Sequence, residues 1–278
     1  MAACSSMPAP TTEMAVTEKA VKDAEIAGAR EYAPLELRRA NEKYEAAENA
    51  MKKEDYEKTN VIGSQNIVTF CKKNNIPRLV FTSSPSVVFD GKSIKGGDES
   101  LPYAKHFYCD YARTKAISEQ FVLESNSSTL RTCALRPHLI WGPEDPHFLP
   151  RLTDKAKKNR IFQVGNGHNQ VDTIYVDNAA KAHVCALEAL EKTTLLCGKP
   201  YFIGQEKPIN LYLFIKELLA TQKIATTFKK IPLPFAFFMG KAFETVYHLL
   251  KEYKKDPPIS QFLALQLGKS HFFSHKKA

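Results

Sequence analysis

The segment Arg78-Leu-Val-Phe-Thr-Ser-Ser84 is a short apolar run that ends in three hydroxyl side chains. Runs of this kind are typical of buried parallel strands, because helices cover both faces of such a strand. A second apolar run, from Thr129 to Pro137, follows after a stretch of helical character. Strands that alternate with helices predict an α/β fold with a parallel sheet and crossover helices.

The alternation of helix and strand begins near Asn60 and continues along the chain. Helices are predicted for residues 60–74, 107–124 and 177–192 from their apolar spacing. A further strand is predicted for Tyr201-Phe-Ile203. These elements extend the parallel sheet beyond its first pair of strands.

The first 59 residues differ from the rest in charge. They hold 9 Lys/Arg against 12 Asp/Glu, a net charge of −3, so the remaining residues carry +12 and the whole chain +9. Helices are predicted from Thr12 to Ala29 and from Pro34 onward. Together they predict an α-helical hairpin over residues 1–58. No Gly or Pro occurs between Leu35 and Ile62, so the second helix is predicted to continue as one rod to about Lys73.

The segment Met1-Ala-Ala-Cys4-Ser-Ser6, followed by Ala-, Glu- and Lys-rich helices, resembles the mature start of small bacterial lipoproteins with a helical-hairpin domain of unknown function. In those proteins the corresponding cysteine is lipidated. No apolar stretch precedes Cys4, and an ordinary cysteine in an N-terminal tail is the alternative. Lipidation of Cys4 is left open.

Composition narrows the range of functions. No stretch approaches the ~18 apolar residues of a membrane span. The lysines are scattered in pairs without an aromatic–basic motif, so no nucleic-acid binding is predicted. The six cysteines form no CxxC pair, which predicts reduced thiols, no metal site and a cytoplasmic protein. Association with a membrane surface is left open.

The segment Tyr111-Ala-Arg-Thr-Lys115 lies on the predicted helix 107–124. Residues i and i+4 share a helical face, so the Lys115 ammonium is expected beside the Tyr111 hydroxyl, where it favours the phenolate and a general base. Ser84, at the carboxyl end of its strand, is expected to hold the oxygen of a substrate alcohol or ketone. By itself the YxxxK spacing is a weak motif, and a tyrosine on a helix is commonly a packing residue.

These motifs occur in a fixed order. After Thr82-Ser-Ser84 come Val87-Val-Phe89, Asp98-Glu-Ser100, the Tyr111 to Lys115 segment and Leu135-Arg-Pro-His-Leu-Ile-Trp-Gly-Pro143. The series resembles the second half of extended short-chain dehydrogenases, in particular the 3β-hydroxysteroid dehydrogenase and sterol 4α-carboxylate 3-dehydrogenase branch. The resemblance covers about residues 60–273.

The resemblance implies an NAD(P)-dependent oxidoreductase that oxidises a sterol-like secondary alcohol to a ketone by hydride transfer. It implies catalytic roles for Ser84, Tyr111 and Lys115, and for Asn60 as a helix residue that organises a water relay near the lysine. NAD or NADP is the cofactor that it implies. The residues that it marks for the nicotinamide end are Thr82, Ser83, Pro137 and His138.

The family's opening βαβ unit holds the cofactor diphosphate on a glycine-rich turn. None of the twelve glycines here fall at GxGxxG or GxxGxxG spacing. We therefore predict an incomplete Rossmann-like parallel sheet with the Arg78 to Ser84 strand at an exposed edge. The predicted domains are the hairpin at 1–58 and a truncated Rossmann-like dehydrogenase domain at 59–278, with a mainly helical substrate lobe in 145–170 and 205–278.

The segment Pro232-Leu-Pro-Phe-Ala-Phe-Phe-Met239 leads into a predicted helix with further aromatic residues. This predicts an apolar, sterol-like substrate, with core packing as the alternative. Peripheral membrane contact and homo-oligomers are left open. Two other functions stay open: a non-catalytic helical interaction protein that retains a dehydrogenase remnant, and a sugar-nucleotide epimerase or reductase, which the aromatic segment disfavours.

Overall fold

The computed structural model describes residues 56–143, 145, 148–250 and 257–278. The predicted hairpin, Cys4 and most of the predicted rod lie outside these residues. From Glu57 the described chain is helical: a π-helix, η2 (Glu57–Ile62), leads directly into α4 (Gly63–Lys73). The helix predicted for 60–74 is therefore confirmed, and it continues on its N-terminal side as far as the description reaches.

The central element is a three-stranded sheet in the order β1-β3-β8, with all strands parallel. Its strands are β1 (Arg78–Thr82), β3 (Arg131–Pro137) and β8 (Lys199–Ile203). The middle strand β3 is buried from its second residue onward, whereas the side chains of β1 are mostly half-buried. The predicted α/β fold with a parallel sheet is confirmed, and within the described residues β1 lies at the edge of the sheet.

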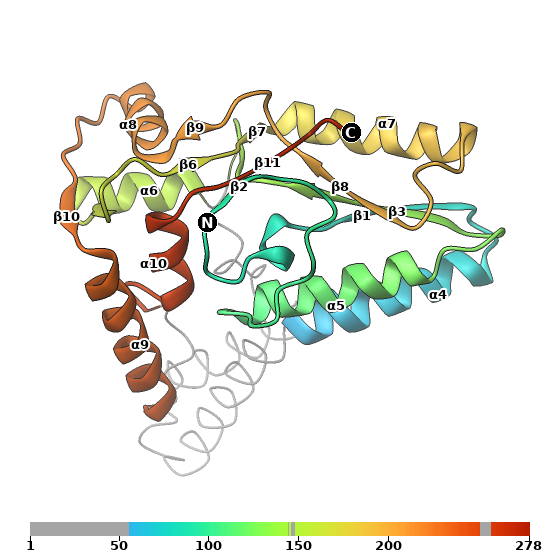
Figure 1. Cartoon of the computed structure of the whole chain (residues 1–278), viewed down its shortest axis with the longest axis horizontal. Helices are drawn as coiled ribbons and strands as arrows, with labels where there is room; N and C mark the ends of the chain where they lie inside the picture. Colours follow the sequence, from blue (N-terminus) through green and yellow to red (C-terminus); the bar gives the residue numbers. More distant parts are fainter. Residues whose placement is uncertain (1–55, 144, 146–147, 251–256) are drawn as a thin grey trace, which may run out of the picture.

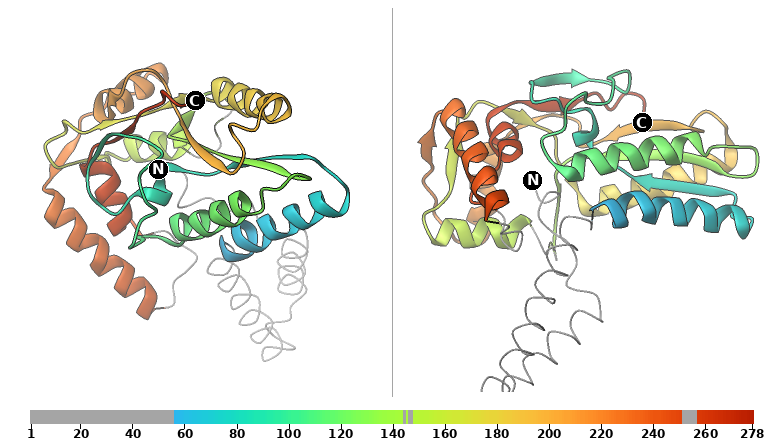
Figure 2. Two further views of the ribbon diagram at one scale, coloured as in Figure 1. Left: turned by 45° about the vertical axis from the view of Figure 1, so that its right-hand side comes forward. Right: turned by 90° about the horizontal axis from the view of Figure 1, so that it is seen from below.

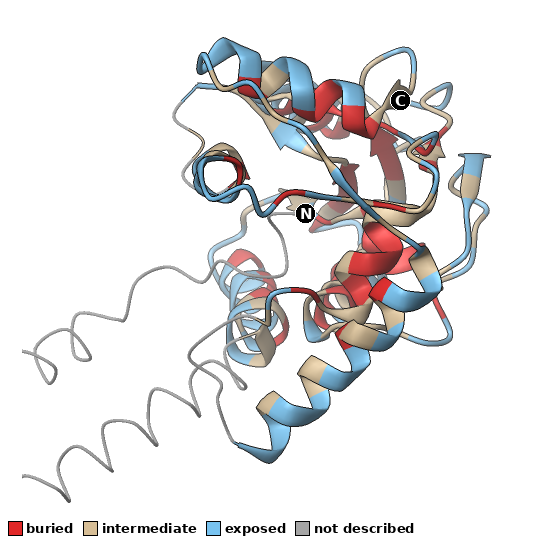
Figure 3. Cartoon of the chain, turned by 90° about the vertical axis from the view of Figure 1, so that its left-hand side faces the viewer, coloured by how far each residue is buried: buried red, intermediate tan, exposed pale blue. Residues whose placement is uncertain are grey.

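Helices cover both faces of this sheet (Figure 1). The helices α4 and α5 (Asp110–Glu124) lie on one face, and α7 (Val176–Lys192) lies on the other. Leu135 of β3 and Leu190 of α7 are buried in one apolar cluster, and Val122 of α5 is buried in another. Figure 3 shows buried residues in red on the strands and on the inward helix faces. The molecule therefore has a three-layer core.

The remaining helices form a second group at one end of this core (Figure 2). Very short strands connect them in a four-stranded sheet of order β2-β11-β6-β9 and in the pairs β10-β5 and β4-β7. The lobe is mainly helical, as predicted, and its strands of two or three residues were not predicted because they are too short to show a periodicity. The helices of this group are α6 (Phe148–Lys157), α8 (Leu211–Thr221), α9 (Leu233–Leu249) and α10 (Gln261–Gly268). The short helix η3 (Pro85–Val88) belongs instead to the core, where it packs against α5. The strands are β2 (Ile94–Gly97), β4 (Ile140–Trp141), β5 (Phe162–Val164), β6 (Gln170–Val171), β7 (Ile174–Tyr175), β9 (Ile209–Asn210), β10 (Lys229–Ile231) and β11 (His271–Phe273).

The strand β11 joins the second group to the core. It pairs in parallel with β2 and β6. The Phe273 ring stacks on Phe202 of β8 with 4.1 Å between ring centroids. The Phe273 amide donates a hydrogen bond of 2.6 Å to a carboxylate oxygen of Asp172, which is 1% exposed. These contacts fix the last residues of the chain against the sheet.

Replacing Leu190 by Ala is expected to lower the free energy of unfolding by about 2–5 kcal/mol, because a fully buried side chain leaves a cavity between α7 and the sheet. Leu187 of the same helix is 41% exposed and is the matched control; its replacement by Ala is expected to change stability by no more than about 0.5 kcal/mol. Urea unfolding curves measure both effects. Equal losses in the two variants would contradict the packing of α7 described above.

Candidate active site

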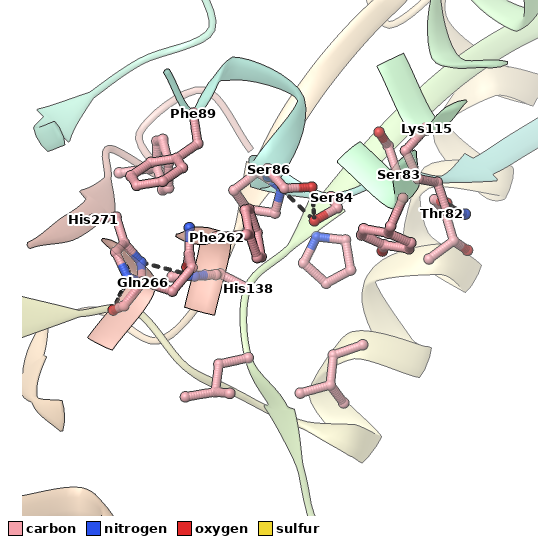
Figure 4. A pocket seen from close by; sticks show the side chains of 16 residues that line it. Thr82, Ser83, Ser84, Ser86, Phe89, Lys115, His138, Phe262, Gln266 and His271 are labelled. Atoms are coloured by element: carbon pink, nitrogen blue, oxygen red, sulfur yellow. Dashed lines mark hydrogen bonds between the residues drawn. The ribbon is translucent and has the colours of Figure 1, made fainter. Parts of the chain in front are cut away.

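A pocket of about 270 Å³ lies where β1 and β3 end (Figure 4). Its walls come from the residues that follow these strands, from the first turns of α5, and from α10 and β11. The carboxyl ends of parallel strands meet at one edge of a sheet, which is where open α/β sheets bind ligands. Seven of the eight predicted site residues line this pocket: Thr82, Ser83, Ser84, Tyr111, Lys115, Pro137 and His138.

The hydroxyl of Ser84 is oriented by the turn that follows β1. Ser84 has an extended backbone and caps η3: its Oγ accepts hydrogen bonds from the Ser86 amide at 3.2 Å and from the Ser86 hydroxyl at 3.0 Å. Both bonds use lone pairs of the Ser84 oxygen. The Ser84 proton is therefore not used by either bond, and the side chain can donate it to a ligand.

The Lys115 side chain is fixed against the end of β1. Its Nζ donates a hydrogen bond of 2.9 Å to the Thr82 carbonyl oxygen and lies 4.9 Å from the centre of the Phe81 ring. Burial lowers the pKa of Lys115, and the Glu119 carboxylate opposes this shift. Tyr111 lies one turn earlier on the same helix and also lines the pocket, as the YxxxK spacing predicts.

Two histidines close the opposite end of the pocket. The ring nitrogens His271 Nδ1 and His138 Nε2 are 3.1 Å apart, and His271 Nε2 lies 2.9 Å from the Gln266 carbonyl oxygen. Burial lowers the pKa of His271 to about 4, and it lowers the pKa of His138 well below its ordinary value. Both rings are therefore neutral near pH 7.

This geometry determines the tautomers. A carbonyl oxygen only accepts, so His271 carries its proton on Nε2 and its Nδ1 accepts from the Nε2 proton of His138. The remaining nitrogen, His138 Nδ1, is then a bare acceptor. It is buried without a hydrogen-bond partner among the described residues, as is Ser83 Oγ. The pocket wall thus holds polar groups whose hydrogen bonding the described residues do not complete.

Asn60 is the predicted site residue that does not line the pocket. Its Nδ2 donates a hydrogen bond of 2.9 Å to the Thr114 hydroxyl, which in turn donates to the Asp110 carbonyl oxygen at 2.8 Å. Asn60 therefore connects η2 to the helix that carries Tyr111 and Lys115. Its role in a water relay stays a prediction.

Sequence reasoning missed the wall formed by the C-terminal residues. The predicted aromatic segment became α9, none of whose residues line the pocket. Instead the apolar wall comes from rings that lie far apart in the sequence, and Phe89 meets Phe262 edge-to-face at 6.1 Å. No local pattern marks these residues, because each belongs to a short or irregular element. The pocket residues that were missed are Pro85, Ser86, Phe89, Leu139, Ile140, Phe262, Gln266, His271 and Phe273.

None of the helices in the described part of the chain is both long and apolar enough to span a bilayer. The same residues contain no group of three or more His, Cys, Asp or Glu side chains that could hold a metal ion.

Residues 43–234 match the 3-beta hydroxysteroid dehydrogenase/isomerase family. This match spans more than half of the chain and includes all eight predicted site residues. The chain belongs to this family. Residues 12–62 also match a domain of unknown function, DUF4398, which overlaps the start of the family match.

Family relatives include two proteins named 2-alkyl-3-oxoalkanoate reductase. The one from Shewanella oneidensis is 41% identical over 77% of this chain and 57% of its own length. The one from Stenotrophomonas maltophilia is 41% identical over 81% of this chain and 68% of its own length. Human short-chain dehydrogenase/reductase family 42E member 1 is 37% identical, over 79% of this chain and 59% of its own. The chain thus spans roughly three fifths of the length of these relatives.

Solved structures confirm the fold. The crystal structure of gox2253 superposes with a TM-score of 0.59 at 21% identity, covering 80% of this chain and 65% of that one. UDP-glucuronic acid 4-epimerase from Bacillus cereus, solved in complex with NAD, superposes with a TM-score of 0.55 at 17% identity, covering 78% and 59%. The family fold is therefore Rossmann-like, as predicted.

Acidification is expected to destabilise the folded family domain through its histidine pair. The folded pKa of His271 is about 4 against an ordinary value of 6.5, so within this window the unfolded chain binds more protons than the folded chain. The contribution of neutral His271 to the free energy of unfolding is fully present above pH 6.5 and is lost as the pH falls towards 4. Carboxylates also titrate in this range, so the comparison needs a matched variant.

His271→Gln is that variant, because an amide offers a donor to the Gln266 carbonyl and an acceptor to His138 without titrating. Urea midpoints measured at several pH values between these limits should fall more steeply in the parent than in His271→Gln. Identical slopes would mean that His271 is not held neutral in the folded protein.

Proposed function

We propose that this chain carries the catalytic residues of a nicotinamide-dependent oxidoreductase that interconverts a secondary alcohol and a ketone. The observation that supports it most directly is that Ser84, Tyr111 and Lys115 line one pocket although they come from two different elements. Membership of a dehydrogenase family supports the same reaction class.

The three side chains have complementary tasks in this proposal. Tyr111 takes the proton of the substrate hydroxyl as general base in oxidation and returns it in reduction. Lys115 places its positive charge on the same face of α5, where it stabilises the phenolate. Ser84, oriented by Ser86, donates its proton to the substrate oxygen. Thr82, Ser83, Pro137 and His138 would hold a nicotinamide, which would supply the hydride acceptor or donor.

The pocket fits the nicotinamide end of such a cofactor. Thr82, Ser83, Pro137 and His138 line it, and the Ser83 hydroxyl and His138 Nδ1, which have no hydrogen-bond partner among the described residues, belong to its walls. The adenosine and diphosphate end has no corresponding glycine-rich turn anywhere in the sequence. We therefore assign to this chain the half of a cofactor site that orients the reacting ring of NAD or NADP.

An apolar, sterol-like substrate fits the far wall of the pocket. Phe89, Phe262, Phe273, Leu139 and Ile140 line it, and the neighbouring histidines are neutral. A second candidate is an alkyl-substituted 3-oxo acid, which the 41% identity to the two named reductases favours. Turnover of a 3β-hydroxysterol against that of a 2-alkyl-3-hydroxy acid distinguishes the candidates, since the acid brings a carboxylate that the apolar wall does not pair.

Tyr111→Phe is expected to lower the rate of alcohol oxidation by roughly 10²- to 10⁴-fold, because the ring still packs but the exchangeable proton is gone. The assay follows NAD(P)H absorbance with excess cofactor. Tyr108→Phe, three residues earlier and outside the pocket, is the control and should retain the parent's rate. A parent rate in Tyr111→Phe would remove Tyr111 from the mechanism.

Binding of NAD(H) or NADP(H) to the purified chain is expected to be weak. The diphosphate is normally bound by backbone amides of the glycine-rich turn, and losing several charge-assisted hydrogen bonds of about 1.5–3 kcal/mol each weakens binding by several powers of ten. Isothermal titration calorimetry on the full chain measures this. A dissociation constant in the micromolar range would show that another part of the chain binds the diphosphate.

A further inference from the structure

A buried ion pair joins α5 to β3. Glu119 is 0% and Arg136 2% exposed. Arg136 Nε donates to Glu119 Oε2 at 3.0 Å and Nη2 donates to Oε1 at 2.6 Å, so the pair is bidentate. The Tyr103 hydroxyl donates to Glu119 Oε1 at 2.7 Å. The guanidinium lies 4.9 Å from the Phe202 ring centre and 5.6 Å from that of Tyr103.

Both charges adjoin residues of the proposed active site. Glu119 lies one helical turn beyond Lys115 and two turns beyond Tyr111, so all three share a face of α5. Arg136 immediately precedes Pro137, which lines the pocket at the end of β3. The pair therefore links two elements that both contribute residues to the pocket.

A buried ion pair of this kind contributes little net free energy to folding. Removing two charges from water costs several kcal/mol per ion, and apolar residues of similar volume often hold two elements together equally well. Breaking the pair by losing one partner is strongly destabilising, because it leaves an uncompensated buried charge. A shift of α5 along β3 would break both hydrogen bonds at once, so the pair fixes the helix in one register.

We propose that Glu119 and Arg136 are positioning residues of this active site, whose ion pair fixes α5 against β3 and whose carboxylate acts on the Lys115 ammonium. The inference rests on the proposed function, since it names what holds the catalytic helix. Neither residue lines the pocket, so neither touches the substrate.

The surroundings of Lys115 favour an effect of the Glu119 charge. Burial lowers the pKa of Lys115, and the Glu119 carboxylate is the group that opposes this shift. Among the described residues, the other titratable groups of the pocket are Tyr111 on the same helix and the His138–His271 pair across it. His183 of α7 lies 2.8 Å from the Thr82 hydroxyl, and the Arg136 guanidinium is paired with Glu119 itself. In the part of the chain that the structure describes, Glu119 is thus the carboxylate that acts on Lys115.

The test is the protonation midpoint of Lys115 in the full chain, without substrate or cofactor. Carbon-13-labelled lysine gives each Cε resonance against pH, and the loss of one resonance in Lys115→Arg assigns the signal. Glu119→Gln keeps the shape of the side chain and removes its charge. We expect it to lower the midpoint by about one pH unit, the size of a charge interaction across partly buried protein.

Two further variants make the result decisive. Tyr103→Phe removes a hydrogen bond from Glu119 but keeps the charge, and should leave the midpoint at the parent's value. Glu119→Gln combined with Arg136→Met avoids an unpaired buried arginine, so it should recover the parent's stability while the midpoint stays lowered. A parent midpoint in this folded double variant would overturn the inference and reduce the pair to a structural contact. Because no turnover is measured, that outcome leaves the oxidoreductase proposal to be judged by Tyr111→Phe.

Discussion

The parallel pairing of β1 with β3 is the constraint on which the site depends. Two parallel neighbours cannot be joined by a tight turn, so the chain must return along the sheet through a crossover helix, here α5. A crossover helix begins near the carboxyl ends of the strands and runs back antiparallel to them. The first turns of α5, with Tyr111 and Lys115, therefore lie beside Thr82 to Ser84 and Pro137. The reactive end of the pocket follows from topology.

The other end of the pocket depends on contacts between distant parts of the chain. His271 meets His138 across 133 positions, and Asp172 holds the Phe273 amide across 101. Such contacts carry a large loop-closure cost, which the stacking of Phe273 on Phe202 and the strand pairing of β11 offset. The pocket is completed only when the C-terminal strand is docked, so its apolar wall and its histidine pair form together.

The two ends of the pocket therefore differ in polarity. Hydroxyl groups and the Lys115 ammonium lie at the strand ends, and aromatic rings with neutral histidines lie opposite. Half-burial makes each electrostatic contact near Lys115 stronger than it would be in water, which is why a carboxylate on the next turn of α5 matters. The basic charge of the chain does not create this site, because most of its lysines lie elsewhere on exposed positions.

The sequence by itself determined the local elements and the reactive residues. An apolar run with no polar alternation marks a strand buried on both faces, which predicted β1 and β3, and the i, i+4 spacing placed Tyr111 and Lys115 on one helical face. Seven predicted residues meet in one pocket because the βαβ geometry fixes where the strands end and where the crossover helix begins.

Only the tertiary structure decided which distant groups complete this pocket. Gln266, His271 and Phe273 lie on an eight-residue helix and a three-residue strand, whose patterns are too short to predict an orientation. The Glu119–Arg136 pair was equally hidden, since two opposite charges separated by 17 positions resemble exposed surface residues until the fold buries them against each other.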